Sequence, residues 1–152
     1  MTTKTFTYDV VVIGSGAAGF NAANTILKDG RKSVALITEG LNFGTSRNTG
    51  SDKQTYYKLS MSGNSLDSVK LMAKNIFDGG AVDGDNALCE AALSTRCFLN
   101  LCELGVPFPT NRYGEYIGYK TDHDPFERAT SAGPLTSKFM TEALQKQAFE
   151  LD

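Results

Sequence analysis

Residues 8–19 read Tyr8-Asp-Val-Val-Val-Ile13 followed by Gly14-Ser-Gly-Ala-Ala-Gly19. The apolar run shows little alternation, which predicts a strand buried on both faces of a parallel sheet. An alanine-rich segment, residues 20–29, follows the glycines and predicts a helix closed by Gly30. A second apolar run at residues 33–38 then predicts a parallel strand, joined by the usual right-handed crossover. Together these segments predict one βαβ unit.

The glycine spacing G-x-G-x-x-G stands between a buried strand and the opening of a helix. Gly14 allows a tight turn, Gly16 lets the backbone approach a diphosphate, and Gly19 lets the helix pack closely on the strand. The helix N-terminus adds unpaired N–H groups and positive partial charge. The sequence therefore predicts a dinucleotide site whose diphosphate is held by Gly14, Ser15, Gly16, Ala17, Ala18 and Gly19.

Glu39, with Gly40 beside it, lies at the end of the second strand and twenty residues after Gly19. From this position an acidic side chain accepts hydrogen bonds from an adenosine ribose, and its charge disfavours a 2′-phosphate such as that of NADP. The alternative is a glycine-rich turn followed by an exposed glutamate, with no ligand.

The segment after Glu39 changes character. Residues 44–55 are almost wholly polar and predict a loop, without helix or strand, that is ordered by itself or by a ligand. Helices are predicted from residue 65 to Gly79-Gly80, from about 84 to 103 and from about 135 to 149, with short strands around 113–119. For the second of these helices, Asp85 is the expected cap, and the expected apolar stripe is Leu88, Ala91, Ala92, Leu99 and Cys102.

The chain has 152 residues, a net charge of -2 and a pI near 5.4, with its basic residues scattered, which argues against nucleic acid as a partner. It has neither a secretory pattern at the N-terminus nor an apolar run of membrane-spanning length, so we expect a soluble, cytoplasmic protein. Cys89, Cys97 and Cys102 have neither zinc nor redox spacing and are expected to be small apolar residues of a helix.

Three segments resemble the flavoprotein family of succinate dehydrogenase, fumarate reductase and L-aspartate oxidase. They are residues 9–19 with Glu39, the polar loop Gly44-Thr-Ser-Arg-Asn-Thr-Gly50, and Arg128-Ala-Thr-Ser-Ala-Gly-Pro-Leu-Thr-Ser-Lys138. The resemblance implies FAD as cofactor, with the polar loop on the flavin side: Thr45, Ser46, Arg47, Asn48, Thr49, Gly50 and Ser51. It covers only the N-terminal part of such proteins, so we expect an incomplete domain.

In the succinate dehydrogenase branch, a histidine of the polar loop is bonded to the flavin, whereas this sequence has Arg47 at that place. The resemblance therefore implies noncovalent FAD. Arg47 would pair with FAD phosphate or with negative charge on reduced flavin, or else be a solvated loop residue. Arg128 would lie near the flavin or fix its own loop. His123, within Thr121-Asp-His-Asp-Pro125, is interpreted as part of a surface turn, and no metal site is predicted.

The fold class expected is α/β: a Rossmann-like FAD-binding βαβ unit followed by mostly helical segments. Residues 1–152 would form the N-terminal portion of an FAD-binding domain, with a core at about 8–39, a flavin-side loop at about 41–63 and a helical and loop region at 64–152. The whole protein would transfer hydride between FAD and a dicarboxylate-like substrate, with the remainder of the flavoprotein as partner. The alternatives are an inactive, self-associating nucleotide-binding module and a small NAD-binding domain.

Overall fold

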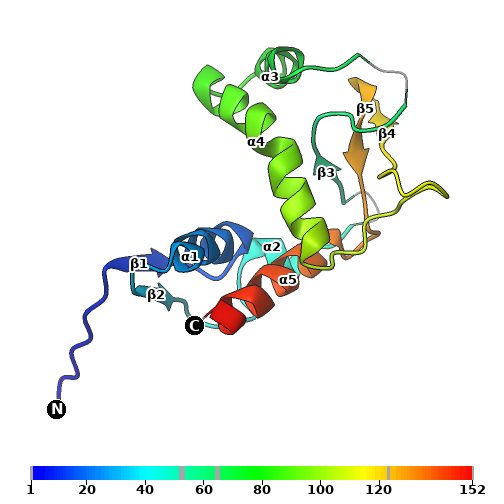
Figure 1. The fold of residues 1–152 in the computed structure, drawn as a ribbon. Coiled ribbons are helices and arrows are strands. Elements are labelled where there is room, and N and C mark those ends of the chain that lie inside the picture. The colour runs from blue at the N-terminus through cyan, green and yellow to red at the C-terminus, as the bar shows by residue number, and fades with distance from the viewer. Residues whose placement is uncertain (1, 52–53, 64–65, 123, 152) are drawn as a thin grey trace. The chain divides into compact units, whose positions relative to one another are not determined.

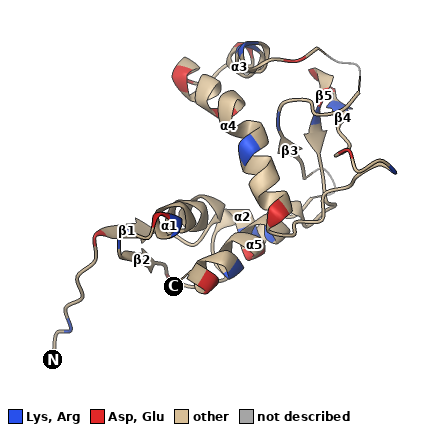
Figure 2. Ribbon diagram, viewed as in Figure 1, with Lys and Arg blue, Asp and Glu red and all other residues tan. Residues whose placement is uncertain are grey.

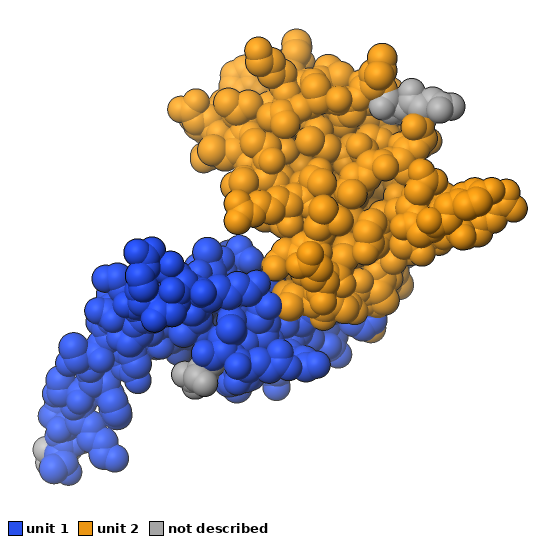
Figure 3. Space-filling view, viewed as in Figure 1, with its two compact units in different colours: residues 1–50, 137–152 blue, residues 51–136 orange. Residues whose placement is uncertain are grey.

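The computed structural model describes residues 2–51, 54–63, 66–122 and 124–151. It divides into two compact units, which are taken separately below (Figure 3). Unit 1 consists of residues 1–50 and 137–152, and unit 2 of residues 51–136. His123 and the predicted helix start at residue 65 lie outside the described residues.

Unit 1 contains the predicted βαβ unit (Figure 1). Strands β1 (Val10–Ile13) and β2 (Val34–Ile37) are parallel, with Val10 opposite Val34 and Ile13 opposite Ile37. Helix α1 (Ala17–Asp29) connects them and ends at Gly30, whose positive φ of 68° is the left-handed conformation that glycine adopts readily. The α/β class and the helix boundary predicted from the sequence are confirmed.

The prediction that the first strand is buried on both faces is wrong for this chain. Val11 is 52% exposed and Ile13 is 84% exposed, and on the second strand Ile37 is 55% exposed. Burial alternates along β1, which means that only one face of the two-stranded sheet is covered within the described residues.

The polar loop contains one short helical turn, α2 (Thr45–Asn48), where no helix was predicted. Its backbone closes when the amide of Thr49 donates to the carbonyl of Thr45 at 2.9 Å. Helix α5 (Thr136–Leu151) confirms the predicted last helix and ends two residues later than expected. Within unit 1 it packs on α1, where the Asn24 side-chain amide donates to the Leu144 carbonyl at 2.9 Å.

Unit 2 combines a small antiparallel sheet with two helices. The strands are β3 (Tyr56–Tyr57), β4 (Tyr119–Thr121) and β5 (Asp124–Thr130), in the order β3-β5-β4. The strands expected around 113–119 are therefore misplaced, since only residue 119 belongs to one. Strand β5 carries a proline and three charged residues, so neither its composition nor its pattern predicted it.

Helices α3 (Val69–Asp78) and α4 (Gly84–Glu103) confirm two predicted helices. The described residues 66–68, which were expected to be helical, precede α3, whose cap is Ser68. For α4, the cap and the buried face differ from expectation. Asp83, not Asp85, accepts hydrogen bonds from the amides of residues 85 and 86. Of the expected stripe only Ala91 is buried. The buried residues of the helix are Ala87, Ala91, Ser94, Phe98 and Leu101.

Packing explains this choice of face. Met72 and Ala73 of α3 form a core with Ala91, and the Phe98 ring lies 4.7 Å from that of Phe108. Both sides of α4 carry apolar side chains, so its sequence alone did not distinguish the face that meets α3. Leu88 and Leu99 are left 46% and 38% exposed.

Charges of both signs are interspersed on α4 and α5, as Figure 2 shows. On α5 they alternate at intervals of four residues, in the order Lys138, Glu142, Lys146 and Glu150. Across the described ranges, none of the helices has the length and apolar character needed to cross a membrane.

Candidate nucleotide-binding site

The glycine turn, residues 14–16, joins the end of β1 to the start of α1. Gly14 has a φ of +105°, which favours glycine, and its amide donates to the Ile37 carbonyl at 2.8 Å. Gly16 caps α1 with backbone alone: no side chain accepts from the first amides of the helix, and its first turn, which includes Ala17 and Ala18, has no acidic residue. A helix N-terminus of this kind attracts an anion.

Gly19 has no room for a side chain. A Cβ built at this position would lie 2.0 Å from the carbonyl oxygen of Gly14. The first turn of α1 therefore packs directly on the backbone of the glycine turn. This contact holds the helix N-terminus close to the turn.

The polar loop lies against the same turn. A Cβ on Gly16 would lie 3.4 Å from the Ser46 hydroxyl oxygen, and one on Gly44 would lie 3.5 Å from the Gly16 Cα. Gly44 also has a φ of +99°. The sequence prediction placed Gly16 and Ser46 in the cofactor site but gave Gly44 only as the start of the polar loop, although a glycine that opens a polar loop is a recognisable signal.

Ser15 faces the protein interior rather than the open side of the turn. It is 3% exposed, and its hydroxyl lies 2.8 Å from that of Thr38 and donates to the Gly40 carbonyl at 3.0 Å. Its backbone remains part of the predicted diphosphate site. Thr38, which the sequence reasoning missed, links the turn to the end of β2.

Glu39 lies two residues beyond the end of β2 and is exposed. Because β1 and β2 are parallel and in register, the glycine turn and Glu39 follow the carboxyl ends of neighbouring strands. This edge is where nucleotides bind in open α/β sheets.

The residues predicted on the flavin side are mostly held by the protein itself. The Asn48 side-chain amide donates to the carbonyls of Asn42, at 2.8 Å, and Gly44, at 3.0 Å. The Thr49 hydroxyl donates to the Thr45 carbonyl. Gly50 is exposed, and Ser51 belongs to unit 2.

Arg47 is not a solvated residue, so that interpretation was wrong. Its side chain is 14% exposed and donates to Glu142 at 3.0 Å and to Gln145 at 2.6 Å. Both partners lie on α5, 95 and 98 residues further along the chain. No local pattern in the sequence indicated these contacts.

Arg128 fixes its surroundings in unit 2. Its side chain is 0% exposed and pairs with both oxygens of Asp67, at 2.8 and 2.6 Å. It also donates to the Tyr57 hydroxyl and the Asn75 side-chain amide oxygen, both at 3.0 Å, and lies 3.3 Å from an Asp124 carboxylate oxygen. Burial alone would lower the pKa of Arg128, but the hydrogen bonds to Asp67 and Tyr57 raise it.

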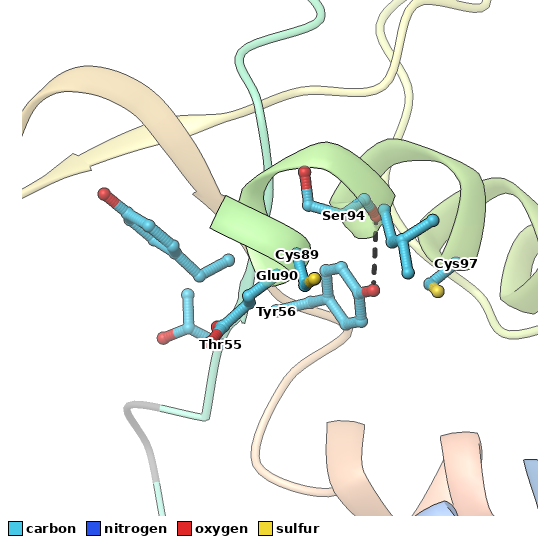
Figure 4. Close-up of a pocket in the computed structure, with 8 residues that line it drawn as sticks. Thr55, Tyr56, Cys89, Glu90, Ser94 and Cys97 are labelled. Carbon is cyan, nitrogen blue, oxygen red and sulfur yellow. Dashed lines mark hydrogen bonds between the residues drawn. The ribbon is translucent and has the colours of Figure 1, made fainter. Parts of the chain in front are cut away.

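Unit 2 also has a hollow between β3 and α4, with a volume of about 510 Å³ (Figure 4). Cys89 and Cys97 line it; both lie on α4, as the helix prediction implied, and both are exposed free thiols. The Tyr56 hydroxyl donates to the Ser94 carbonyl at 3.3 Å. Within the described part of the chain, no three His, Cys, Asp or Glu side chains are grouped to hold a metal ion.

A sequence profile of the FAD binding domain matches residues 9–143, nearly the whole chain. The chain belongs to the FAD-binding domain family. FAD is accordingly its cofactor. A search of the curated proteins finds no match to this FAD-binding domain.

Solved structures share the fold of this FAD-binding domain. The Mycobacterium smegmatis Sdh1 complex in the apo form has a TM-score of 0.79 at 22% identity, over 92% of this chain and 23% of that one. Escherichia coli quinol fumarate reductase FrdA has a TM-score of 0.78 at 18% identity, over 98% and 25%. A Rhodococcus jostii 3-ketosteroid dehydrogenase has a TM-score of 0.69 at 18% identity, over 99% and 37%. This chain thus spans about a quarter of the length of the first two.

The residues of the FAD-binding domain suit the cofactor. The α1 N-terminus has no side-chain cap, and glycines line its approach. No basic side chain contributes to the glycine turn itself, so the helix N-terminus and the backbone amides are the groups that suit a diphosphate.

Proposed function

We propose that unit 1 binds the adenosine diphosphate half of FAD at the edge formed by the glycine turn and Glu39. The backbone of residues 14–19 would hold the diphosphate, and the Glu39 carboxylate would accept hydrogen bonds from the ribose, with Gly40 beside it. The loop of residues 45–51 would form the flavin side of the site.

The observation that carries this proposal is the start of α1, which has no side-chain cap and follows a turn that admits no side chain at Gly19. Helix amides and partial positive charge are thus available at one point, at the carboxyl ends of two parallel strands. Ser15 and Thr38 hold the turn in this geometry without occupying its open side.

We further propose that FAD is held noncovalently. The position at which the resemblance expects a flavin-linked histidine carries Arg47, whose guanidinium stays protonated and is a poor nucleophile. Its engagement by Glu142 and Gln145 also supports this proposal.

In the whole protein, we propose a flavin-dependent oxidoreductase acting on a dicarboxylate-like substrate. Bound FAD would supply the hydride chemistry, while the protein orients and shields it. The resemblance and the fold shared with quinol fumarate reductase support this substrate class. The remaining part of the flavoprotein as partner and a cytoplasmic location belong to the same proposal.

The test is the absorption spectrum of the purified chain after FAD is added and the excess is removed by gel filtration. We expect flavin absorbance to co-elute with the protein and acid to release all of it. Flavin that stays with the acid-precipitated protein would contradict noncovalent binding, and protein without flavin would contradict binding by this chain. Succinate formation from fumarate by the reduced whole protein tests the substrate class.

A further inference from the structure

Arg47 lies in the flavin-side loop, yet its charged group is directed at α5. One terminal nitrogen donates to Glu142 at 3.0 Å and the other to Gln145 at 2.6 Å. The arginine side chain is 14% exposed and that of Glu142 is 40% exposed. The guanidinium is thus largely enclosed and its charge is matched by a carboxylate.

The backbone beside Arg47 is closed on itself and rests on the glycine turn. The Asn48 side-chain amide donates hydrogen bonds to the carbonyls of Asn42 and Gly44, and Gly44 lies against Gly16. The contacts of Arg47 with α5 and those of Asn48 within the loop therefore hold residues 44–48 in place beside the glycine turn.

We propose that Arg47 is a positioning residue: with Glu142 and Gln145 it forms a latch that fixes residues 44–48 against the glycine turn and thereby sets the affinity for the flavin half of FAD. This inference rests on the proposed function. It assigns Arg47 no contact with the cofactor, unlike the phosphate or flavin contact that the sequence suggested.

Electrostatics separates the two roles. If Arg47 attracted the diphosphate directly, the neighbouring Glu142 carboxylate would weaken that attraction, and removing its charge would tighten binding. If Arg47 acts through the latch, removing the Glu142 charge loosens the loop and weakens binding. The same substitution therefore has opposite signs in the two cases.

The experiment measures the dissociation constants of FAD and ADP for the 152-residue chain and its variants. Arg47→Met and Glu142→Gln are each expected to raise the dissociation constant of FAD roughly three- to tenfold, as for loss of a partly exposed charged pair. The double variant should bind FAD no more weakly than the weaker-binding single variant, because the two substitutions remove the same interaction. ADP affinity should stay unchanged, since ADP has no flavin half.

Lys138→Met is the matched control. Lys138 lies 3.9 Å from the same Glu142 oxygen but takes no part in the latch, so its removal should leave FAD affinity within about twofold. The exchanged pair Arg47→Glu with Glu142→Arg should regain most of the lost FAD affinity. Tighter FAD binding by Glu142→Gln, or a parallel loss of ADP affinity in Arg47→Met, would overturn the proposal.

Amide hydrogen exchange without cofactor separates failure of the latch from failure of the proposed function. The latch predicts faster exchange at residues 44–49 in both Arg47→Met and Glu142→Gln than in the unsubstituted chain. Unchanged exchange overturns the latch even where FAD binds. A chain that binds neither FAD nor ADP contradicts the proposed function, and the exchange rates still decide the latch. Arg47→Lys is the conservative substitute if Arg47→Met does not fold.

Discussion

Gly19 is the residue at which the sequence motif and the packing of unit 1 coincide most closely. A methyl group there would meet the Gly14 carbonyl oxygen at 2.0 Å, so α1 would have to move away from the turn. We predict that Gly19→Ala lowers the free energy of unfolding by about 1–3 kcal/mol, as overpacking does. Urea unfolding followed by circular dichroism measures it.

Ala22→Ser is the control for that substitution, because Ala22 is exposed on the same helix. It should cost only about 0.5 kcal/mol, the difference in helix propensity. Equal costs for the two variants would show that Gly19 is not confined by the turn.

Arg128 supports unit 2 from a fully buried position between two carboxylates. Arg128→Met would leave Asp67, whose side chain is 4% exposed, and Asp124, which is 8% exposed, without their cation. We predict a loss of about 3–5 kcal/mol at neutral pH. The control is Arg112→Met, at an exposed arginine, which should change the free energy of unfolding by no more than about 0.5 kcal/mol.

The loss of stability caused by Arg128→Met should depend on pH in a defined direction. Burial alone would raise the pKa of Asp67, but hydrogen bonds from Arg128 and from the amides of Ser60 and Ser68 lower it. Stabilisation by this carboxylate is therefore present above its ordinary pKa of about 4 and is lost as the pH falls through the lower folded-state pKa. The difference in the free energy of unfolding between the unsubstituted chain and Arg128→Met should become smaller at acid pH. A difference that stays constant with pH would contradict this assignment.

Sequence reasoning succeeded at residues whose partners are close along the chain and failed where partners are remote. The glycine motif could be interpreted because Gly14, Gly16 and Gly19 act within one turn. The partners of Arg47 and Arg128 lie 53 to 98 residues away in most cases, and no local spacing encodes such contacts.

The start of α4 shows the same contrast at the scale of an element. The helix was predicted at its observed bounds, but its cap was assigned to Asp85, whereas Asp83 accepts from two amides of the first turn. A cap stands just outside the helix, so an error of two residues in its position moves the capping role to another side chain.

We predict that Asp83→Ala destabilises the protein by about 1 kcal/mol through loss of the cap. Asp85→Ala should cost less, about 0.5 kcal/mol, because an acidic residue in the first turn interacts only with the helix dipole. Thermal unfolding of both variants under identical conditions measures the difference. A larger effect for Asp85→Ala would favour the cap expected from the sequence.

For the whole molecule, the uncovered face of the β1–β2 sheet has the clearest consequence. Val11, Ile13 and Ile37 expose apolar surface on strands that form a two-stranded sheet within the described residues. Faces and edges of this kind favour association. The sequence predicted the strands but not their exposure, because β-branched runs are usual in strands buried on both faces.

We predict that the 152-residue chain self-associates and that Ile13→Ser together with Ile37→Ser reduces this association. Sedimentation velocity over a range of concentrations measures it. Leu66→Ser is the control, since Leu66 is 93% exposed but lies in unit 2, outside this sheet. Equal effects of the control and the paired variant would mean that the sheet face is not the contact.

The central claim is that the edge formed by the glycine turn and Glu39 binds the adenosine diphosphate half of FAD. Calorimetric titration of FAD, ADP and FMN into the chain tests it most directly. The account predicts that FAD binds, that ADP competes with it and that FMN does not bind. It also predicts that Gly16→Val weakens FAD binding at least about tenfold, because the valine side chain blocks the approach of the diphosphate to the backbone. FMN binding as tightly as FAD, or full FAD affinity in Gly16→Val, would contradict it.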